Sequence, residues 1–253
     1  MLDVTGRAEP ASPYPAPPKE RPYMEEIERS PGRLRIAWSG DSPFGTTVDP
    51  EILAALEATA NLLADLGHEV VNTRIEADLM SIYAAASPLG GANFAAGMKR
   101  MIERVGREPE PQELEPFTWM LLHGSRQVSG ADALYSAQER RSAVRPILQF
   151  FEAWDVFLSP VLGALPPPIG YLDPVVVSPE EAYRRSVEIF PFTWPFNFTG
   201  QPSISLPLQQ SKSGLPIGMM FSARYADEAT LFRLAAQLEK ECPWAGRKPP
   251  IWN

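Results

Sequence analysis

Between residues 33 and 71, short apolar runs alternate with a longer amphipathic stretch. Residues 34–38 form a short apolar run typical of a strand, and residues 68–71 form another. Between them, Pro50 stands at the first position of a predicted helix that Asp49 or Thr47 can cap. Apolar residues recur there every three or four positions: Ile52, Leu53, Leu56, Ala60 and Leu63. This order predicts a βαβ unit with parallel strands and a right-handed crossover.

Residues 79–153 carry mainly helical periodicity. Gly90–Gly91 predicts a break in the first helix, and the acidic, proline-containing stretch 107–116 predicts a linker to the next. The last helical stretch, residues 131–154, should bury one face against the rest of the fold. The residues expected on that face are Leu134, Ala137, Val144, Ile147, Leu148 and Phe151.

A third strand is predicted at residues 154–160, where an apolar run leads into a proline-rich loop. Residues 171–187 show no clear periodicity and are expected to form a surface loop. Further on, two apolar runs at residues 204–208 and 217–221 flank a polar turn, which predicts a hairpin. Gly218 within the second run indicates the close approach of another backbone or a ligand.

A helix capped by Asp227 should follow this hairpin and end at Pro243. Its apolar residues share one face: Leu231, Leu234, Ala235 and Leu238. His68, at the start of the second strand, is expected to be a loop or surface histidine, because no second histidine or carboxylate cluster lies at ligand spacing.

Four features of residues 190–239 occur in the order found in the amidase signature hydrolases. They are the Asn197/Gly200/Pro202 turn, Pro207 in the following strand, the Gly214–Gly218 hairpin and the Asp227–Glu228 helix start. Each is weak alone, since Gly and Pro punctuate many loops, but the four in register form a specific pattern. The chain therefore resembles the amidase signature family; the alternative is a generic hairpin and helix.

The resemblance extends to two earlier segments. Residues 154–160 resemble the family's Asp-x-x-x-x-Pro strand, whose end borders the active site. Residues 2–6 resemble the end of a family helix that precedes a proline-rich stretch, so that Met1 would lie inside an element whose earlier turns are absent. The alternative for this segment is a disordered tail unrelated to the family.

The fold implied is α/β: the C-terminal part of the amidase signature fold, with a mixed β-sheet flanked by helices. Residues 1–32 are expected to form a proline-rich extended segment, and residues 33–253 an amidase-like α/β domain without the catalytic N-terminal half. Strand edges left unpaired by that absence lead us to expect association rather than a monomer.

Members of this family hydrolyse amides with a Ser, a second Ser preceded by a cis peptide, and a Lys base, the serines lying in a Gly-Gly-Ser-Ser-Gly-Gly-like run. Here Ser-Ser does not occur, the Gly-Gly pair at residues 90–91 lies between Leu89 and Ala92, and no lysine lies in a matching context. We therefore assign no catalytic residue, and we expect the chain alone to hydrolyse no amide, because the chemistry needs all three side chains.

Two functional hypotheses remain. In the first, the chain is part of an amidase that becomes active when an N-terminal half is supplied, with a small-molecule amide as substrate. In the second, it is a non-catalytic remnant that binds a ligand or partner, or has no function. The resemblance marks four substrate-pocket candidates, for which core packing is the alternative role: Phe190, Thr193, Trp194 and Asn197. Phe190 occupies a position that is often acidic in amidotransferase-like relatives, and would favour an apolar substrate portion.

The composition excludes several classes of binding partner and several types of site. A formal net charge of -8 argues against nucleic acid or an anionic membrane surface. A single cysteine and two histidines argue against a disulfide or a metal site, and we expect no cofactor.

No apolar run approaches the length of a spanning helix, so a cytoplasmic location is expected. The loop at residues 39–45 lacks a phosphate-binding pattern, and Pro43 removes an amide, which disfavours a nucleotide site.

Overall fold

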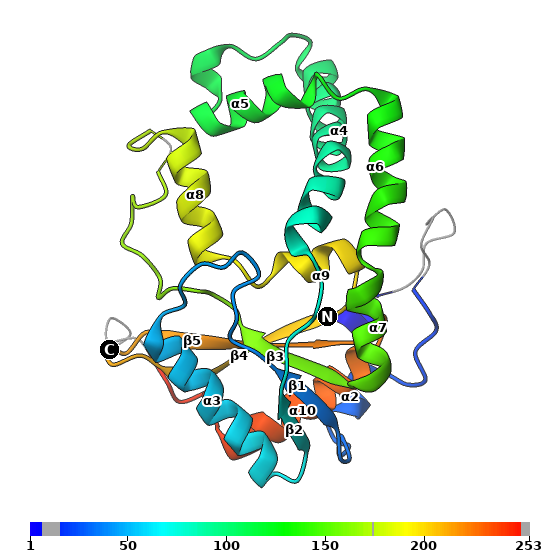
Figure 1. Ribbon diagram of the computed structural model, residues 1–253, viewed down its shortest axis with the longest axis vertical. Coiled ribbons are helices and arrows are strands. Elements are labelled where there is room, and N and C mark those ends of the chain that lie inside the picture. Colours follow the sequence, from blue (N-terminus) through cyan, green and yellow to red (C-terminus); the bar gives the residue numbers. More distant parts are fainter. Residues whose placement is uncertain (7–15, 174, 249–253) are drawn as a thin grey trace.

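A five-stranded mixed sheet forms the centre of the molecule in the computed structural model, which describes residues 1–6, 16–173 and 175–248 (Figure 1). The strands are β1 (Arg35–Trp38), β2 (Glu69–Asn72), β3 (Val156–Pro160), β4 (Ser203–Gln210) and β5 (Pro216–Ala223). Their order across the sheet is β2-β1-β3-β5-β4. β1 runs parallel to β2 and β3, whereas β5 is antiparallel to β3 and β4. The predicted α/β class, the parallel βαβ unit and the hairpin are confirmed.

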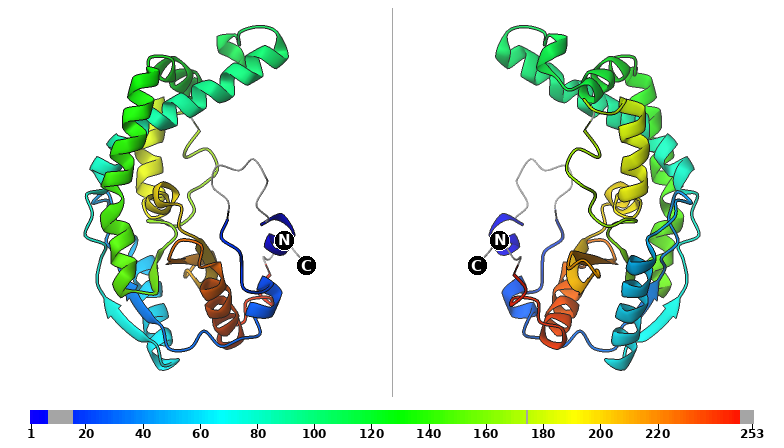
Figure 2. Two further views of the ribbon diagram at one scale, coloured as in Figure 1. Left: turned by 90° about the vertical axis from the view of Figure 1, so that its right-hand side faces the viewer. Right: turned by 90° about the vertical axis from the view of Figure 1, so that its left-hand side faces the viewer.

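Helices cover both sides of this sheet and extend beyond it. They are α1 (Leu2–Thr5), α2 (Tyr23–Glu26), α3 (Pro50–Asp65), α4 (Leu79–Val105), α5 (Pro116–Ser125), α6 (Gly130–Ala143), α7 (Arg145–Ala153), α8 (Pro179–Ile189), α9 (Trp194–Thr199) and α10 (Glu228–Glu241), with a short 3-10 helix at Pro111–Glu113. α3 and α10 lie on one side of the sheet and α9 on the other (Figure 1). α4, α5 and α6 form an arm that projects away from the sheet (Figure 2).

The strand registers give the sheet two chemically different faces. On one face, Leu158 lies beside Phe221, which lies beside Ile204. We call this the sealed face, because α3 and α10 pack on it and Leu158 and Phe221 are fully buried. The rows on either side of this one point to the other face, which we call the serine face because four of its six residues are serines: Phe157, Ser159, Met220, Ser222, Ser203 and Ser205.

The serine face is covered unevenly. Over β3, aromatic side chains from α7 and α9 pack against Phe157, with Phe150 at 5.7 Å and Phe196 at 6.4 Å between ring centroids. Over β4, Ser203 and Ser205 are exposed. The open face of β4 therefore carries hydroxyl groups.

Asp155 joins the starts of β1 and β3 to the end of β5. Its carboxylate accepts hydrogen bonds from the backbone and guanidinium N–H groups of Arg35 and from Arg224, at 2.8 to 3.4 Å. Burial raises the pKa of Asp155, but the hydrogen bonds and charges of these two arginines hold it below its ordinary value. The ionised carboxylate thus fixes the ends of three neighbouring strands.

The arm departs from the predicted helix boundaries. α4 continues through Gly90–Gly91 without a break, and even through Pro88, which removes one helical hydrogen bond. Ser136 of α6 compensates next to that point, because its Oγ accepts from the backbone N–H of Leu89 and donates to the carbonyl of Ala85. Packing against α6 therefore outweighs the local glycine and proline signals.

Two further expectations were wrong, and a third held only in part. The stretch 131–154 divides into α6 and α7 ahead of Pro146, so Leu134 and Leu148 turn outward and are 71% and 40% exposed. Residues 179–189 form helix α8, capped by Ser178, instead of a surface loop.

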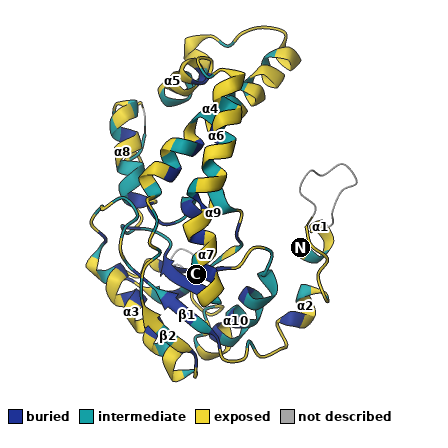
Figure 3. Ribbon diagram, turned by 45° about the vertical axis from the view of Figure 1, so that its right-hand side comes forward, coloured by how far each residue is buried: buried dark blue, intermediate teal, exposed yellow. Residues whose placement is uncertain are grey.

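His68 lies in the loop before β2, as expected, but it is buried and not at the surface. Its Nδ1 accepts from the backbone N–H of Leu34, and its Nε2 bonds Gln237. The arm remains largely exposed compared with the strands (Figure 3).

Gly218 has the close neighbours that its sequence position indicates. The backbone N–H of Val161, in the segment after β3, donates to the Gly218 carbonyl at 3.1 Å. A Cβ added at Gly218 would lie 3.0 Å from Ser205 Oγ and 3.0 Å from Val161 Cγ2, so side chains of β4 and of that segment also pack against it.

The N-terminal segment is fastened to α10 by polar contacts. Asp3 accepts from the backbone N–H groups of Tyr23 and Met24, and from Lys19 Nζ at 2.7 Å. These bonds lower the pKa of Asp3 to about 2, chiefly through Lys19. Glu26, only 2% exposed, accepts from Arg21 and from Arg233 of α10. Part of the expected proline-rich segment, residues 7–15, lies outside the described residues.

Candidate functional site

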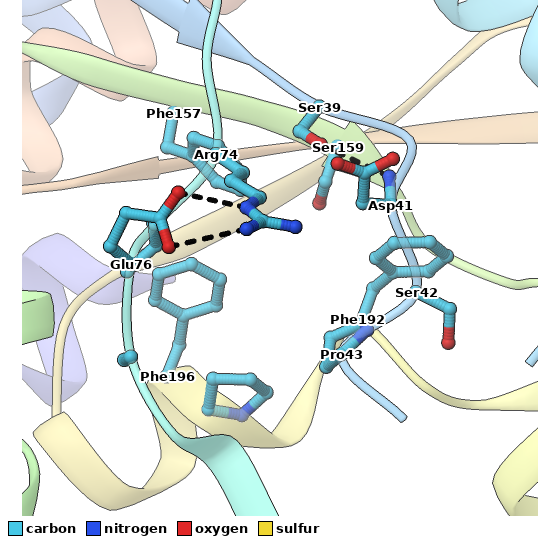
Figure 4. Close-up of a pocket in the computed structure, with 13 residues that line it drawn as sticks. Ser39, Asp41, Ser42, Pro43, Arg74, Glu76, Phe157, Ser159, Phe192 and Phe196 are labelled. Atoms are coloured by element: carbon cyan, nitrogen blue, oxygen red, sulfur yellow. Dashed lines mark hydrogen bonds and ion pairs between the residues drawn. The ribbon is translucent and has the colours of Figure 1, made fainter. Parts of the chain in front are cut away.

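A cavity of about 260 Å³ opens where the parallel strands end (Figure 4). Its walls come from four stretches of chain: the segment after β1, the segment after β2, β3 itself, and the turn into α9. The residues that line it are Ser39, Asp41, Ser42, Pro43, Arg74, Ile75, Glu76, Ala77, Phe157, Ser159, Phe192, Pro195 and Phe196.

Sheet topology explains the place of the cavity. The chain leaves β1 through α3 to reach β2 on one side, and later returns to β3 on the other side of β1. Connections that diverge in this way leave a crevice outside the carboxyl ends of the strands, where α/β proteins commonly bind ligands. The cavity therefore occupies a position suited to a ligand on grounds independent of any relative.

The inner end of the cavity carries two buried hydroxyl groups. Ser39 is 4% exposed and Ser159 is 1% exposed. Ser39 Oγ accepts from the backbone N–H of Asp41, which holds the segment after β1 in a tight turn, and Ser159 Oγ donates to the carbonyl of Pro160. Both serines keep lone pairs that can accept a hydrogen bond.

Charged side chains form the rim. Arg74 Nε lies 2.9 Å from Glu76 Oε1, and its Nη2 lies 3.4 Å from Oε2. The hydrogen bond with Glu76 raises the pKa of Arg74, with a further contribution from the charge of Asp41, and the same bond lowers the pKa of Glu76. Figure 4 shows the guanidinium between Glu76 on one side and Asp41 on the other. Within the described residues, neither Arg74 Nη1 nor the Asp41 carboxylate has a hydrogen-bond partner.

The floor is aromatic. Phe157, Phe192 and Phe196 are 8%, 4% and 5% exposed. The ring of Phe196 lies 6.4 Å from Phe157, so α9 rests on β3 through this contact. An apolar floor below a polar rim matches the usual composition of small-molecule sites.

The structure places the four predicted pocket residues beside this cavity, outside its lining. Phe190 and Asn197 are exposed, while Thr193 and Trp194 are partly buried. Trp194 is linked to the lining, because its ring stacks on Phe44, which follows Pro43 in the segment after β1. We call Trp194 and the aromatic side chains around it the second wall.

Trp194 is fixed within this second wall by aromatic contacts. Its ring stacks on Phe44 at 4.3 Å and meets the edges of Tyr83 at 4.7 Å and Phe198 at 5.4 Å. Tyr83 accepts a hydrogen bond of 2.7 Å from Tyr183. Loss of solvation, followed by this bond, raises the pKa of Tyr183 to about 12. The wall thus joins the segment after β1, the base of the arm and α8.

The arrangement can bind a ligand, but it contains no activated nucleophile among the described residues. Neither Ser39 nor Ser159 bonds a histidine or lysine there, since His68 pairs with Gln237 and His123 contacts Trp119 in the arm. The described residues also hold no group of three or more His, Cys, Asp or Glu that could bind a metal ion. Across the same ranges, no helix combines the length and apolarity needed to cross a membrane.

Sequence reasoning missed Asp41, Arg74 and Glu76. These residues are up to 35 positions apart from one another and at least 80 from β3, so no local motif connects them to it. The available signal was topological: Asp41 follows the first predicted strand and Arg74 follows the second, and parallel strands bring their carboxyl ends to one edge of the sheet.

One protein-family profile and two curated relatives match this chain over nearly its whole length. The profile described as Amidase matches residues 1–232. The 6-aminohexanoate-cyclic-dimer hydrolase of Paenarthrobacter ureafaciens is 33% identical over 261 residues, which covers 100% of this chain and 53% of that protein. The acylamidase of Rhodococcus erythropolis is 26% identical, with coverage of 98% and 51%.

A solved structure of a relative matches this chain over nearly the same share of its length. The structure of 6-aminohexanoate cyclic dimer hydrolase complexed with substrate superposes with a TM-score of 0.89 at 32% identity, and covers 97% of this chain and 52% of that one. The chain thus spans about half the length of the curated relatives that it matches.

Proposed function

Because the chain belongs to the amidase signature family, we propose that it forms the substrate-binding part of a hydrolase of carbon–nitrogen amide bonds. The match of residues 1–232 to the Amidase profile carries this proposal. In it, the Ser-Ser-Lys chemistry comes from polypeptide outside these 253 residues. The absence of Ser-Ser from the sequence, together with coverage of about half of each relative, supports this division.

The chemistry of the proposed reaction assigns separate tasks to the two parts. An unprotonated Lys takes the hydroxyl proton of the nucleophilic Ser through the bridging Ser, and Gly-rich backbone amides hold the oxyanion. This chain contributes side chains that position the amide: those that line the cavity at the ends of β1 and β3, and the four predicted pocket residues Phe190, Thr193, Trp194 and Asn197. Positioning alone accounts for a large share of enzymatic rate enhancement.

A second candidate function is a binding module that performs no hydrolysis. The observation in its favour is that, among the described residues, neither Ser39 nor Ser159 hydrogen-bonds a histidine or a lysine, so the cavity can hold a ligand but has no activated nucleophile. Both candidate functions use the same cavity. They differ in whether the bound ligand is hydrolysed when the polypeptide that supplies the Ser-Ser-Lys chemistry is present.

The test begins with the coding sequence upstream of Met1. If it encodes a Gly-Gly-Ser-Ser-Gly-Gly-like run and a Lys, that region is co-expressed with this chain, and release of amine from linear and cyclic six-carbon amides is measured. We expect turnover by the pair and none by either part alone. The matched variant Trp194→Ala should raise KM for the pair, whereas the exposed arm variant Glu103→Gln should not.

Turnover by the chain alone, or a stable pair without turnover, would contradict the proposal. Upstream sequence without those motifs would favour the binding module.

A further inference from the structure

The stacked rings of Phe44 and Trp194 connect two walls of the cavity. Pro43, which precedes Phe44, lines the cavity, and so does Pro195, which follows Trp194. The two rings stack at 4.3 Å between centroids, with an angle of 20° between their planes. A change in the position of Trp194 would therefore move both the segment after β1 and the start of α9.

Phe44 belongs to a turn, residues 42–46, that one serine holds together. Ser42 Oγ accepts from the backbone N–H groups of Phe44 and Thr46, each at 3.3 Å, and lies 2.6 Å from Thr46 Oγ1. The N–H of Gly45 donates to the Ser42 carbonyl at 3.0 Å. These hydrogen bonds all lie within the turn, whereas the stack on Trp194 ties the turn to a different element, α9.

Tyr83, in the second turn of α4, contacts Trp194 through a second aromatic pair. The ring centroids are 4.7 Å apart and the planes meet at 73°, which is a favoured edge-to-face geometry. Its neighbours Ile82 and Ala86 are 1% and 5% exposed, so this part of α4 is anchored in the fold. The Tyr83 hydroxyl accepts a bond of 2.7 Å from Tyr183 of α8, which limits the orientations open to the Tyr83 ring.

We propose that Tyr83 is a positioning residue for the cavity: it holds Trp194, Trp194 holds the turn at residues 42–46, and Tyr183 holds Tyr83. Packed side chains in direct contact can carry such coupling from one element to the next. Neither tyrosine lines this cavity, so α8 and the base of the arm set the shape of its wall without touching a ligand. The inference rests on the proposed function for the reaction that this shape would serve.

The test compares NMR spectra of the purified 253-residue chain and its variants, and it needs no other polypeptide. Tyr83→Leu removes both the edge contact with Trp194 and the hydroxyl. We expect the indole N–H signal of Trp194 and the backbone amide signals of residues 44–46 to shift, while the amide signals of β5 keep their positions. The heteronuclear NOE of residues 44–46 should fall, because the turn gains fast motion when Trp194 is released.

Hydroxyl variants separate the two steps. Tyr83→Phe and Tyr183→Phe each keep both rings and remove the bond between them, so each should give the same, smaller set of shifts. Combining the two should add nothing, since they remove one interaction. Tyr135→Phe makes the same chemical change on α6, where the side chain is 65% exposed, and should shift none of these signals.

Signals of residues 44–46 that keep their positions and their heteronuclear NOE in Tyr83→Leu would overturn the inference. Shifts of equal size throughout the sheet would overturn it too, because they would indicate a general disturbance of the fold. Additive shifts in the double hydroxyl variant would contradict the part assigned to Tyr183. None of these outcomes decides whether the chain takes part in hydrolysis, which the co-expression experiment measures separately.

Discussion

The two faces of the sheet use the same strands for different purposes. On the sealed face, Phe221 and Leu158 are fully buried and α3 and α10 complete the packing. On the serine face, Ser159 and Phe157 line a cavity, while Ser203 and Ser205 are exposed. Side chains alternate between the two faces along each strand. The residues that stabilise the fold therefore lie on one face of the sheet, and the strand residues that line the cavity lie on the other.

The strongest test of this contrast is to remove a large side chain from the sealed face. Phe221→Ala should lower the free energy of unfolding by about 3–5 kcal/mol, because it leaves a cavity in a packed core. Ser205→Ala, in the neighbouring row on the opposite face and exposed, should change it by less than about 0.5 kcal/mol. Urea unfolding followed by tryptophan fluorescence measures both. Similar losses for the two variants would mean that the faces are not distinct in stability.

A second test concerns the N-terminal segment, which packs on α10 behind the sealed face. Glu26→Gln removes the charge that Arg21 and Arg233 share, and should cost about 1–3 kcal/mol, as expected when a buried partner of charged groups is lost. Glu25→Gln is the control, since Glu25 is exposed. Faster proteolysis between residues 16 and 34 is expected in Glu26→Gln alone. Equal proteolysis of the two variants would show that the segment is held by other contacts.

The open edge of β4 offers a third test. Pro207 has no N–H to donate, and Arg247 donates to the carbonyls of Pro207 and Leu208, so that half of the edge is occupied. Arg247→Ala should increase self-association as measured by light scattering at several concentrations, whereas Lys248→Ala should not. The sequence-based prediction that the chain associates stays a prediction. A sharp monomer peak for Arg247→Ala would show that the edge is protected without Arg247.

The smallest expected effect is a local one at low pH. The pKa of Asp3 is lowered from 3.8 to about 2, so its contribution is complete above pH 3.8 and is lost as the pH falls toward 2. The amide NMR signals of Tyr23 and Met24 should shift over this range, and Asp3→Asn should abolish the shift. Shifts centred on the ordinary pKa of an aspartate would indicate that Lys19 does not stabilise the carboxylate.

Much of the fold followed from the sequence because its signals are local. Asp49 caps α3 and Asp227 caps α10 as predicted, through hydrogen bonds to backbone N–H groups one turn ahead. Errors arose where tertiary contacts decide the outcome. Ser136 sustains α4 next to Pro88, and His68 is buried because Leu34 and Gln237 satisfy both of its ring nitrogens.

The candidate site was only partly accessible from the sequence. The family pattern located the turn into α9 and the end of β3, which do border the cavity. It did not identify Asp41, Arg74 or Glu76, because these residues meet only when parallel strands align. Loop residues placed by topology carry no periodic signal of their own.

The sealed face is packed by α3 and α10 of this chain. We propose that the polypeptide supplying the Ser-Ser-Lys chemistry covers the serine face and the β4 edge. Hydrogen–deuterium exchange of the chain, alone and with that polypeptide, tests this claim directly. We expect the backbone amides of Ser203–Leu206 to become protected in the pair, while those of Leu158 and Phe221 are already protected in the chain alone. Unchanged exchange at Ser203–Leu206 in a pair that hydrolyses amides would contradict the account.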